Sequence, residues 1–260
     1  ALIDGDIPKY AIAFACQRDV YTDGKQEFFV RKYLAGMEVV ALETEETQHY
    51  PELRSKKAVL EETGLTHSRV DVDPIANCLH SVKVMIDGIV KASGATSYSV
   101  YLTKGECFRF KLSPIYKANR ADAPKPVLIP EIQKYLISKY NAQLCTDIEA
   151  DDALGIAQCQ DPRKTIICTI DKDLVSPDQG LRFFWQQVLT GDSIDNIIGL
   201  KGIGNKTALK VLADVPTKDC KEFCLNEYLK RDRTEEDFIL NCKLLWILRK
   251  PLSETYAPKA

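Results

Sequence analysis

Two short apolar segments, each followed at once by an aspartate, constrain the fold of this chain most. Residues 1–3 run into Asp4, and the β-branched stretch 165–170 runs into Asp171. Both stretches are predicted to be buried strands. Between them, apolar residues recur at helical spacing in segments separated by further strand-like residues. This alternation predicts an α/β protein with a mostly parallel sheet and helices on its faces.

The other elements follow from spacing, proline and glycine. Helices are expected from Tyr10, over 75–94, over 130–140, over 151–157 and over 180–189, and a strand is expected over 98–102. Residues 20–70 are polar and indicate only a short strand at 28–30. Beyond residue 196 the strand pattern fades, and 199–212, 220–229 and 235–248 indicate a turn and helices. We expect a core over 1–190 and a helical region over 191–260.

Composition excludes several classes of protein. The 260 residues are 45% hydrophobic and 28% charged, which is typical of a globular protein, and no apolar run approaches the ~20 residues that span a bilayer. The N-terminus lacks the pattern of a secretory signal. Nine scattered cysteines, without a CxxC pair or a histidine at ligand spacing, indicate reduced thiols in a cytoplasmic protein and no structural zinc.

Acidic residues gather in four segments with turn-like or helix-start sequences. These are Asp4-Gly5-Asp6, Glu149-Ala150-Asp151-Asp152, Asp171-Lys172-Asp173, and 191–196 with Asp192 and Asp195. Each segment alone is more often a helix cap or a turn. Together they predict a cation site, because clustered carboxylates repel one another and resist burial. Oxygen ligands suit Mg²⁺ or Mn²⁺, and two such ions can promote phosphoryl transfer.

Two further stretches could contact phosphates. The glycine turn, residues 199–207, precedes an apolar helical run at 208–212, and glycines with a helix N-terminus let backbone N–H groups approach an anion. Its spacing is not that of a nucleotide-binding P-loop. The basic stretch 116–120 combines an aromatic residue with two cations, a composition that can grip a nucleic acid backbone. A plain turn and a solvated loop are the alternatives.

Taken in order, these motifs resemble the flap endonuclease and 5′→3′ exonuclease superfamily, in particular its short phage members. The most specific matches are Tyr116-Lys117-Ala118-Asn119-Arg120, Glu149-Ala150-Asp151-Asp152, Asp171-Lys172-Asp173-Leu174, and 191–196 followed by Gly202-Ile203-Gly204. The resemblance covers most of the chain and thins between about residues 20 and 70. It implies a PIN-like core over 1–190, with a short arch at about 104–140, and a helix–three-turn–helix region over 191–260.

The resemblance also implies roles for individual residues. The implied metal ligands are Asp4, Glu149, Asp151, Asp152, Asp171, Asp173, Asp192 and Asp195. Lys117 matches a phosphate-steering lysine, and Arg120 matches a second phosphate contact. The implied DNA-binding residues are Tyr116, Lys201, Gly202, Ile203, Gly204 and Lys206. The implied cofactors are two Mg²⁺ ions, which Mn²⁺ can replace, and a K⁺ ion held by the glycine turn.

Three departures from the family pattern stand out. An aspartate usually follows the strand at 98–102, but this chain has Leu102-Thr103-Lys104-Gly105 there, so Asp6 or Glu106 is left as a replacement ligand. The interval between Tyr116 and Glu149 is short, which favours a short or open arch. The interval between Asp173 and Asp192 is also compact.

The sequence therefore predicts a monomeric, metal-dependent 5′-nuclease in the cytoplasm of a bacterium or a phage-infected cell. Its substrate would be DNA with a 5′ end, a nick or a flap, or an RNA-primed duplex, and no membrane is involved. Two alternatives remain open. One is a structure-specific DNA-binding protein that has lost catalysis, suggested by the absent aspartate. The other is a small-molecule phosphatase, suggested by Asp4-Gly5-Asp6 after a strand.

Overall fold

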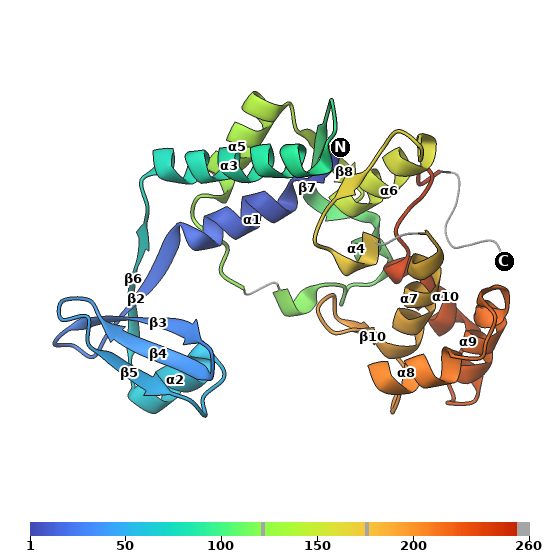
Figure 1. Ribbon diagram of the computed structural model, residues 1–260. Coiled ribbons are helices and arrows are strands. Elements are labelled where there is room, and N and C mark those ends of the chain that lie inside the picture. Colours follow the sequence, from blue (N-terminus) through green and yellow to red (C-terminus); the bar gives the residue numbers. More distant parts are fainter. Residues whose placement is uncertain (121–122, 175–176, 254–260) are drawn as a thin grey trace. The chain divides into compact units, whose positions relative to one another are not determined.

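The computed structural model describes residues 1–120, 123–174 and 177–253 (Figure 1). The chain divides into two compact units. The parallel-sheet unit comprises Ala1–Pro8, Met85–Lys125 and Lys134–Ala260, and the antiparallel-sheet unit comprises Lys9–Val84 and Pro126–Gln133. Three of the four boundaries between them fall inside helices, namely α1 (Asp6–Ala15), α3 (Ile75–Ser93) and α5 (Ile129–Tyr140), and the fourth lies between Lys125 and Pro126.

The parallel-sheet unit is built on four parallel strands in the order β8-β7-β1-β9. The strands are β1 (Leu2–Asp4), β7 (Ser99–Cys107), β8 (Gln143–Asp147) and β9 (Ile167–Cys168). β1 lies between β7 and β9, and Leu2 pairs with Ser99 on one side and Ile167 on the other. Every residue of β1 is buried, which explains why this strand is apolar up to its final aspartate.

Helix α6 (Ala150–Gln160) packs against β1, β7 and β8, with Leu154 fully buried. Its small residue Gly155 faces the backbone near the end of the described chain. A Cβ atom on Gly155 would lie 2.5 Å from the carbonyl oxygen of Leu248. The absence of a side chain there lets residues 244–248 cross close to α6.

Short helices and one small hairpin complete the unit. They are α4 (Phe108–Leu112), α7 (Pro177–Thr190), β10 (Gly191–Asp192), β11 (Ile197–Ile198), α8 (Asn205–Leu212), α9 (Cys220–Leu229) and α10 (Glu235–Leu245), with 3-10 turns at Ala118–Arg120, Lys172–Leu174 and Thr217–Asp219. Trp185, Tyr228 and Phe238 are central to their shared core. The hairpin requires glycine, because a Cβ on Gly191 (φ 71°) would lie 2.3 Å from the nitrogen of Gly199.

The antiparallel-sheet unit has five strands in the order β5-β4-β3-β2-β6. They are β2 (Gln17–Thr22), β3 (Glu27–Tyr33), β4 (Gly36–Ala41), β5 (Thr47–Tyr50) and β6 (Thr66–Val72), and helix α2 (Lys56–Thr63) joins the last two. Ser55 caps the start of α2 and Gly64 ends it in the left-handed conformation. The core on one face includes Tyr21, Val39 and Val59.

The predicted α/β class, with a parallel sheet flanked by helices, is confirmed. The strand expected at 28–30 lies within β3, whereas the other four strands of the antiparallel sheet were not predicted. The strand expected over 165–170 is reduced to Ile167–Cys168. The predicted boundary at residue 190 stays a prediction, and parts of the predicted arch and helical region (121–122 and 254–260) lie outside the described residues.

Among the described residues, no helix is both long and apolar enough to cross a membrane. The nine cysteines are all free, as expected, and most are buried.

Candidate functional site

The carboxyl ends of three parallel strands bring acids from distant segments to one edge of the sheet. Asp4 ends β1, Asp171 follows β9, and Glu149 and Asp151 lie where β8 passes into α6. Ligands bind at this edge in open parallel sheets. Three of the four acidic segments are therefore neighbours by topology.

Asp4 is held rigidly at the end of its strand. Its carboxylate accepts hydrogen bonds from the Asp6 backbone N–H at 3.0 Å and from the Thr169 hydroxyl at 3.1 Å. Burial, with a further contribution from Asp6, raises the pKa of Asp4 to about 6. The surroundings of Asp4 therefore disfavour its ionised form, although most of this carboxyl group is still ionised at neutral pH.

Asp151, in the first turn of α6, is the most perturbed of these acids. Burial raises its pKa to about 8, and the charges of Asp4 and Asp171 add to the effect. Carboxylates repel in this way only when they are close and poorly screened. Asp4, Asp151 and Asp171 thus form a single electrostatic cluster.

Asp173 and Asp192 extend this cluster. Asp173 lies in the turn Lys172–Leu174, donates its N–H to Asp171 at 2.9 Å and accepts a hydrogen bond from Gln187 at 3.1 Å. Burial, Asp171 and Asp192 raise the pKa of Asp173 to about 6. Asp192 accepts the backbone N–H of Ile194 at 2.8 Å, which orders the hairpin turn.

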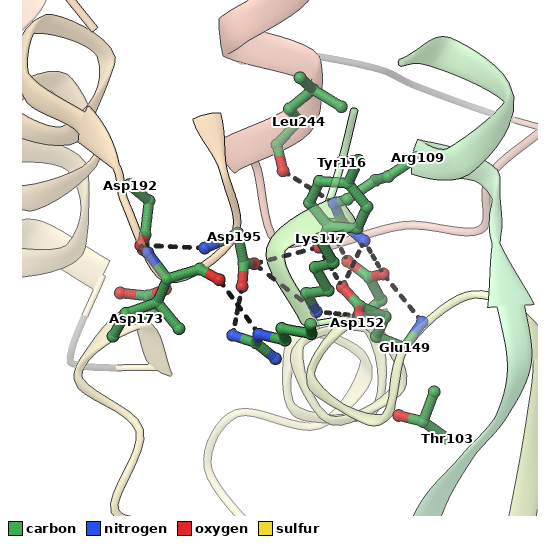
Figure 2. Close-up of polar contacts among 12 residues, drawn as sticks. Thr103, Arg109, Tyr116, Lys117, Glu149, Asp152, Asp173, Asp192, Asp195 and Leu244 are labelled. Carbon is green, nitrogen blue, oxygen red and sulfur yellow. Dashed lines mark hydrogen bonds and ion pairs between the residues drawn. The ribbon is translucent and has the colours of Figure 1, made fainter. Parts of the chain in front are cut away.

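Glu149 and Asp195 are neutralised by the basic stretch (Figure 2). The ammonium group of Lys117 forms a hydrogen bond with Glu149 and lies 3.5 Å from an oxygen of Asp195. Although burial opposes it, the charges of Glu149 and Asp195 raise the pKa of Lys117. The backbone of Lys117 is left-handed (φ 54°), and its N–H donates to the carbonyl of Asp195 at 2.9 Å.

Tyr116 and Arg120 bind the same two acids. The Tyr116 hydroxyl lies 2.9 Å from Glu149 and 3.1 Å from Asp195. Arg120 donates to Asp195 at 2.6 Å and to the carbonyl of Ile194 at 3.0 Å. The structure therefore brings the basic stretch to the acidic segments, which the sequence could only suggest.

Asp152 has a setting unlike that of the other acids. It is fully buried, and both of its oxygens accept hydrogen bonds from Arg109, at 2.6 and 2.8 Å. They also accept the backbone N–H groups of Glu149 and Leu248. This occupied carboxylate differs from the free metal ligand that we expected. Sequence reasoning missed Arg109, although a lone arginine between Phe108 and Phe110 was a usable signal.

Thr103 lies in the segment 102–105, where the predicted resemblance would place an aspartate. Its backbone N–H donates to Asp6 at 3.1 Å, and its hydroxyl accepts the N–H of Ala150 at 2.9 Å. It therefore satisfies a donor at the start of α6. Of the two replacement acids considered, Asp6 lies beside Asp4 and Thr103, whereas Glu106 is exposed near the end of β7.

The donor chemistry of the cluster fits hard divalent cations. All of its donors are carboxylate oxygens, and their mutual repulsion is what a bound cation would relieve. Within residues 1–120, 123–174 and 177–253, however, no three acid, histidine or cysteine side chains converge closely enough to hold one ion. Glu149 and Asp195 are directed instead to Lys117 and Arg120.

The glycine turn is anchored from within. Leu200 and Ile203 are buried in the helical core, whereas Lys201 and Lys206 are exposed. Gly202 adopts a left-handed conformation (φ 81°), and Gly204 precedes the first turn of α8. The turn thus presents backbone groups and two cations to solvent.

Known proteins share part of this sequence. No protein-family model matches the chain. It is 29% identical over 185 residues to thermostable DNA polymerase I of Thermus caldophilus, covering 58% of this chain and 22% of the polymerase. It is 31% identical over 148 residues to DNA polymerase I of Pseudomonas aeruginosa, covering 45% and 16%. The chain therefore spans only about a fifth of these relatives.

A solved structure resembles about two thirds of the chain. The phage T5 D15 protein, co-crystallised with metal ions, superposes with a TM-score of 0.50 at 19% identity, over 64% of this chain and 82% of that one. The two proteins share a fold. The shared fold is the one that the predicted resemblance implied. A D15 structure described as a flap endonuclease with DNA and metal ions aligns with a TM-score of 0.48.

Proposed function

We propose that this chain is a metal-dependent 5′-nuclease that hydrolyses phosphodiesters of DNA at or near a 5′ end. One observation carries the proposal: the mutually repelling cluster of the buried Asp4, the partly buried Asp151 and the exposed Asp171 at the carboxyl edge of the parallel sheet. Such a cluster requires cations, and the phosphate-binding candidates Lys117 and Arg120 contact Glu149 and Asp195 in the same unit. The fold shared with the T5 D15 protein supports this assignment.

The proposed ligands of two Mg²⁺ or Mn²⁺ ions are Asp4, Glu149, Asp151, Asp171, Asp173, Asp192 and Asp195. Bound divalent ions would supply Lewis-acid chemistry for the attack of water on phosphorus. Asp152 would act on this cluster through the backbone of Glu149, to which it is hydrogen-bonded at 3.1 Å.

Lys117 and Arg120 would exchange their carboxylate partners for the scissile phosphate when the acids bind metal. Both side chains retain access to solvent, at 19% and 46% of their surface. Cations that contact a phosphate stabilise the charge that develops on it during hydrolysis. Tyr116 would hold Glu149 in place through its hydroxyl.

The glycine turn would anchor the DNA duplex away from the cut. Lys201 and Lys206 would contact phosphates, and the backbone around Gly202, Ile203 and Gly204 would hold a K⁺ ion against the DNA. A monomer is sufficient for this arrangement, because every proposed residue belongs to one unit of one chain. The substrates include nicked, flapped and RNA-primed duplexes in the cytoplasm of a bacterium or phage-infected cell.

The test is incubation of the protein and Mg²⁺ with end-labelled 5′-flap, nicked, blunt and RNA-primed duplexes, with mapping of the products. We expect cleavage near the 5′ end that leaves a 5′-phosphate. Asp171→Asn should abolish cleavage and leave duplex binding intact. Full activity of that variant would refute the assignment of Asp171.

A second candidate is favoured by the absence of an acid from Leu102-Thr103-Lys104-Gly105, the segment in which the family pattern would have one. On this reading the chain is a structure-specific DNA-binding protein without catalysis. Tight flap binding with no product under Mg²⁺ or Mn²⁺ would select it over the nuclease.

A further inference from the structure

Arg109 is the largest fully buried side chain among the described residues. It lies in the short helix α4, and its guanidinium group donates hydrogen bonds to two different segments of the chain. One is the acidic motif, with Asp152 at 2.6 and 2.8 Å and Glu149 at 3.3 Å. The other is the C-terminal segment, with the carbonyls of Leu244 at 2.8 Å and Trp246 at 2.7 Å.

The acidic side of this arrangement fixes the start of α6. Asp152 accepts the N–H of Glu149 at 3.1 Å, which closes a capping box around the first turn. Asp151 lies inside that turn, between the two bonded residues. The directions of the Glu149 and Asp151 side chains therefore depend on where Asp152 is held.

The C-terminal side leads to the glycine turn. Leu244 belongs to α10, and Asn241 on the same helix donates to the carbonyl of Ile198 at 2.8 Å. Ile198 directly precedes the glycine turn at Gly199. The N–H of Leu248 also donates to Asp152 at 3.0 Å. Hydrogen bonds thus connect the turn to the acidic motif through α10 and Arg109.

We propose that Arg109 is a positioning residue that aligns the first turn of α6, and with it Glu149 and Asp151, against the helical region that bears the glycine turn. The inference rests on the proposed function, which assigns metal binding to the acidic motif and DNA binding to the glycine turn. A planar guanidinium fork is needed, because one group must bind a carboxylate with two parallel hydrogen bonds and reach two carbonyls. A lysine would keep the charge and lose most of this geometry.

Two variants test the proposal. Arg233→Lys is the matched control, because within the part of the chain that the structure describes Arg233 forms an ion pair only with Asp237, four residues along its own chain. The first is Arg109→Lys. The second combines Arg109→Met with Asp152→Leu, since replacing a buried ion pair by apolar residues is often neutral for stability. Each protein is examined for thermal unfolding, Mn²⁺ affinity by calorimetry without DNA, duplex affinity and single-turnover cleavage.

We expect both variants to fold and to bind duplex DNA like the wild type. Their Mn²⁺ affinity and cleavage rate should fall by about 10- to 100-fold, the usual effect of losing a group that orients metal ligands. The double variant should lose no more than Arg109→Lys, because the two residues act as one unit. Arg233→Lys should match the wild type in every measurement.

Wild-type Mn²⁺ affinity in either folded variant would overturn the proposal. A much larger loss in the double variant would also overturn it, by placing Asp152 itself on the metal. If only one variant folds, that variant decides, and if neither folds the role of Arg109 is structural and the proposal fails. Failure of the wild type to cleave DNA would instead reject the proposed function, while Mn²⁺ affinity would still decide on Arg109.

Discussion

The ammonium group of Lys117 contacts the carboxylates of Glu149 and Asp195, two residues that are far apart in the sequence (Figure 2). A cation of the protein itself therefore occupies part of the acidic site. Any divalent ion bound by these acids must compete with it. The same movement that admits a metal ion would release Lys117 to bind a phosphate.

Removing this internal cation should strengthen metal binding. We expect Lys117→Met to bind Mn²⁺ without DNA about tenfold more tightly, which corresponds to about 1.4 kcal/mol. Isothermal calorimetry at constant ionic strength measures the change. Lys111→Met is the control, because Lys111 is exposed and pairs with the exposed Asp147 at 3.4 Å. Weaker Mn²⁺ binding by Lys117→Met would show that the ammonium group does not compete.

The same residue should have the opposite effect on catalysis. With saturating metal and flap DNA, Lys117→Ala should lower the single-turnover rate by about 100- to 1,000-fold, the range found when a group that stabilises developing charge is lost. Duplex affinity should change little, because we propose that the glycine turn provides that contact. An unchanged rate would remove Lys117 from the reaction.

The acidic cluster should destabilise the metal-free fold in a pH-dependent way. Because burial raises the pKa of Asp151 to about 8, from an ordinary value of 3.8, the folded state binds a proton that the unfolded state has lost. This stabilising contribution is complete below pH 3.8 and disappears as the pH rises through about 8. Asp4 and Asp173, with pKa values of about 6, act in the same direction at lower pH.

Asp151→Asn should therefore raise the free energy of unfolding in chelator at pH 8 by at least about 1 kcal/mol, given about 1.4 kcal/mol per pKa unit. The melting temperature should rise accordingly. The gain should shrink toward pH 5. Scanning calorimetry across this range measures it, with the exposed Asp147→Asn as the control. A lower melting temperature for Asp151→Asn at pH 8 would contradict the electrostatic account.

The glycine turn should govern binding and not chemistry. Changing Lys201 and Lys206 to alanine together should weaken duplex affinity and reduce the slope of log affinity against log salt by about 2, since each phosphate contact contributes about 1. Cleavage at saturating DNA should be retained. Lys218→Ala, an exposed change outside the turn, should leave the slope unchanged. An unaltered slope in the double variant would exclude these phosphate contacts.

Local patterns were sufficient for much of the parallel-sheet unit. The apolar run before Asp4 fixed a buried strand, and Asp151 marked the start of α6, because strand burial and helix capping depend on neighbouring residues. Apart from the strand at 28–30, the sheet over 17–72 was not predicted, because most of its strands lack a regular alternation of apolar and polar residues. The strand Thr66–Val72, for example, shows no alternation of buried and exposed positions.

The site could be predicted as a set of residues but not as an arrangement. The pairing of Arg109 with Asp152 joins side chains 43 positions apart, and no spacing rule indicates such a contact. The contact of Lys117 with Glu149 depends on side-chain rotation within the folded chain. The resemblance implied that every one of these acids is a metal ligand, but it did not indicate that Asp152 is fully buried and hydrogen-bonded to Arg109.

The main chain of Lys117 need not move when its side chain changes partners. Its N–H remains bonded to the carbonyl of Asp195, so the main chain is a fixed pivot and only the rotatable bonds of the side chain need to turn. Rotamer changes of accessible side chains take about picoseconds to nanoseconds, far less than loop rearrangements. Handover of the ammonium group from carboxylate to phosphate would therefore be faster than any step of DNA docking, and stopped-flow traces of metal binding should show no lag.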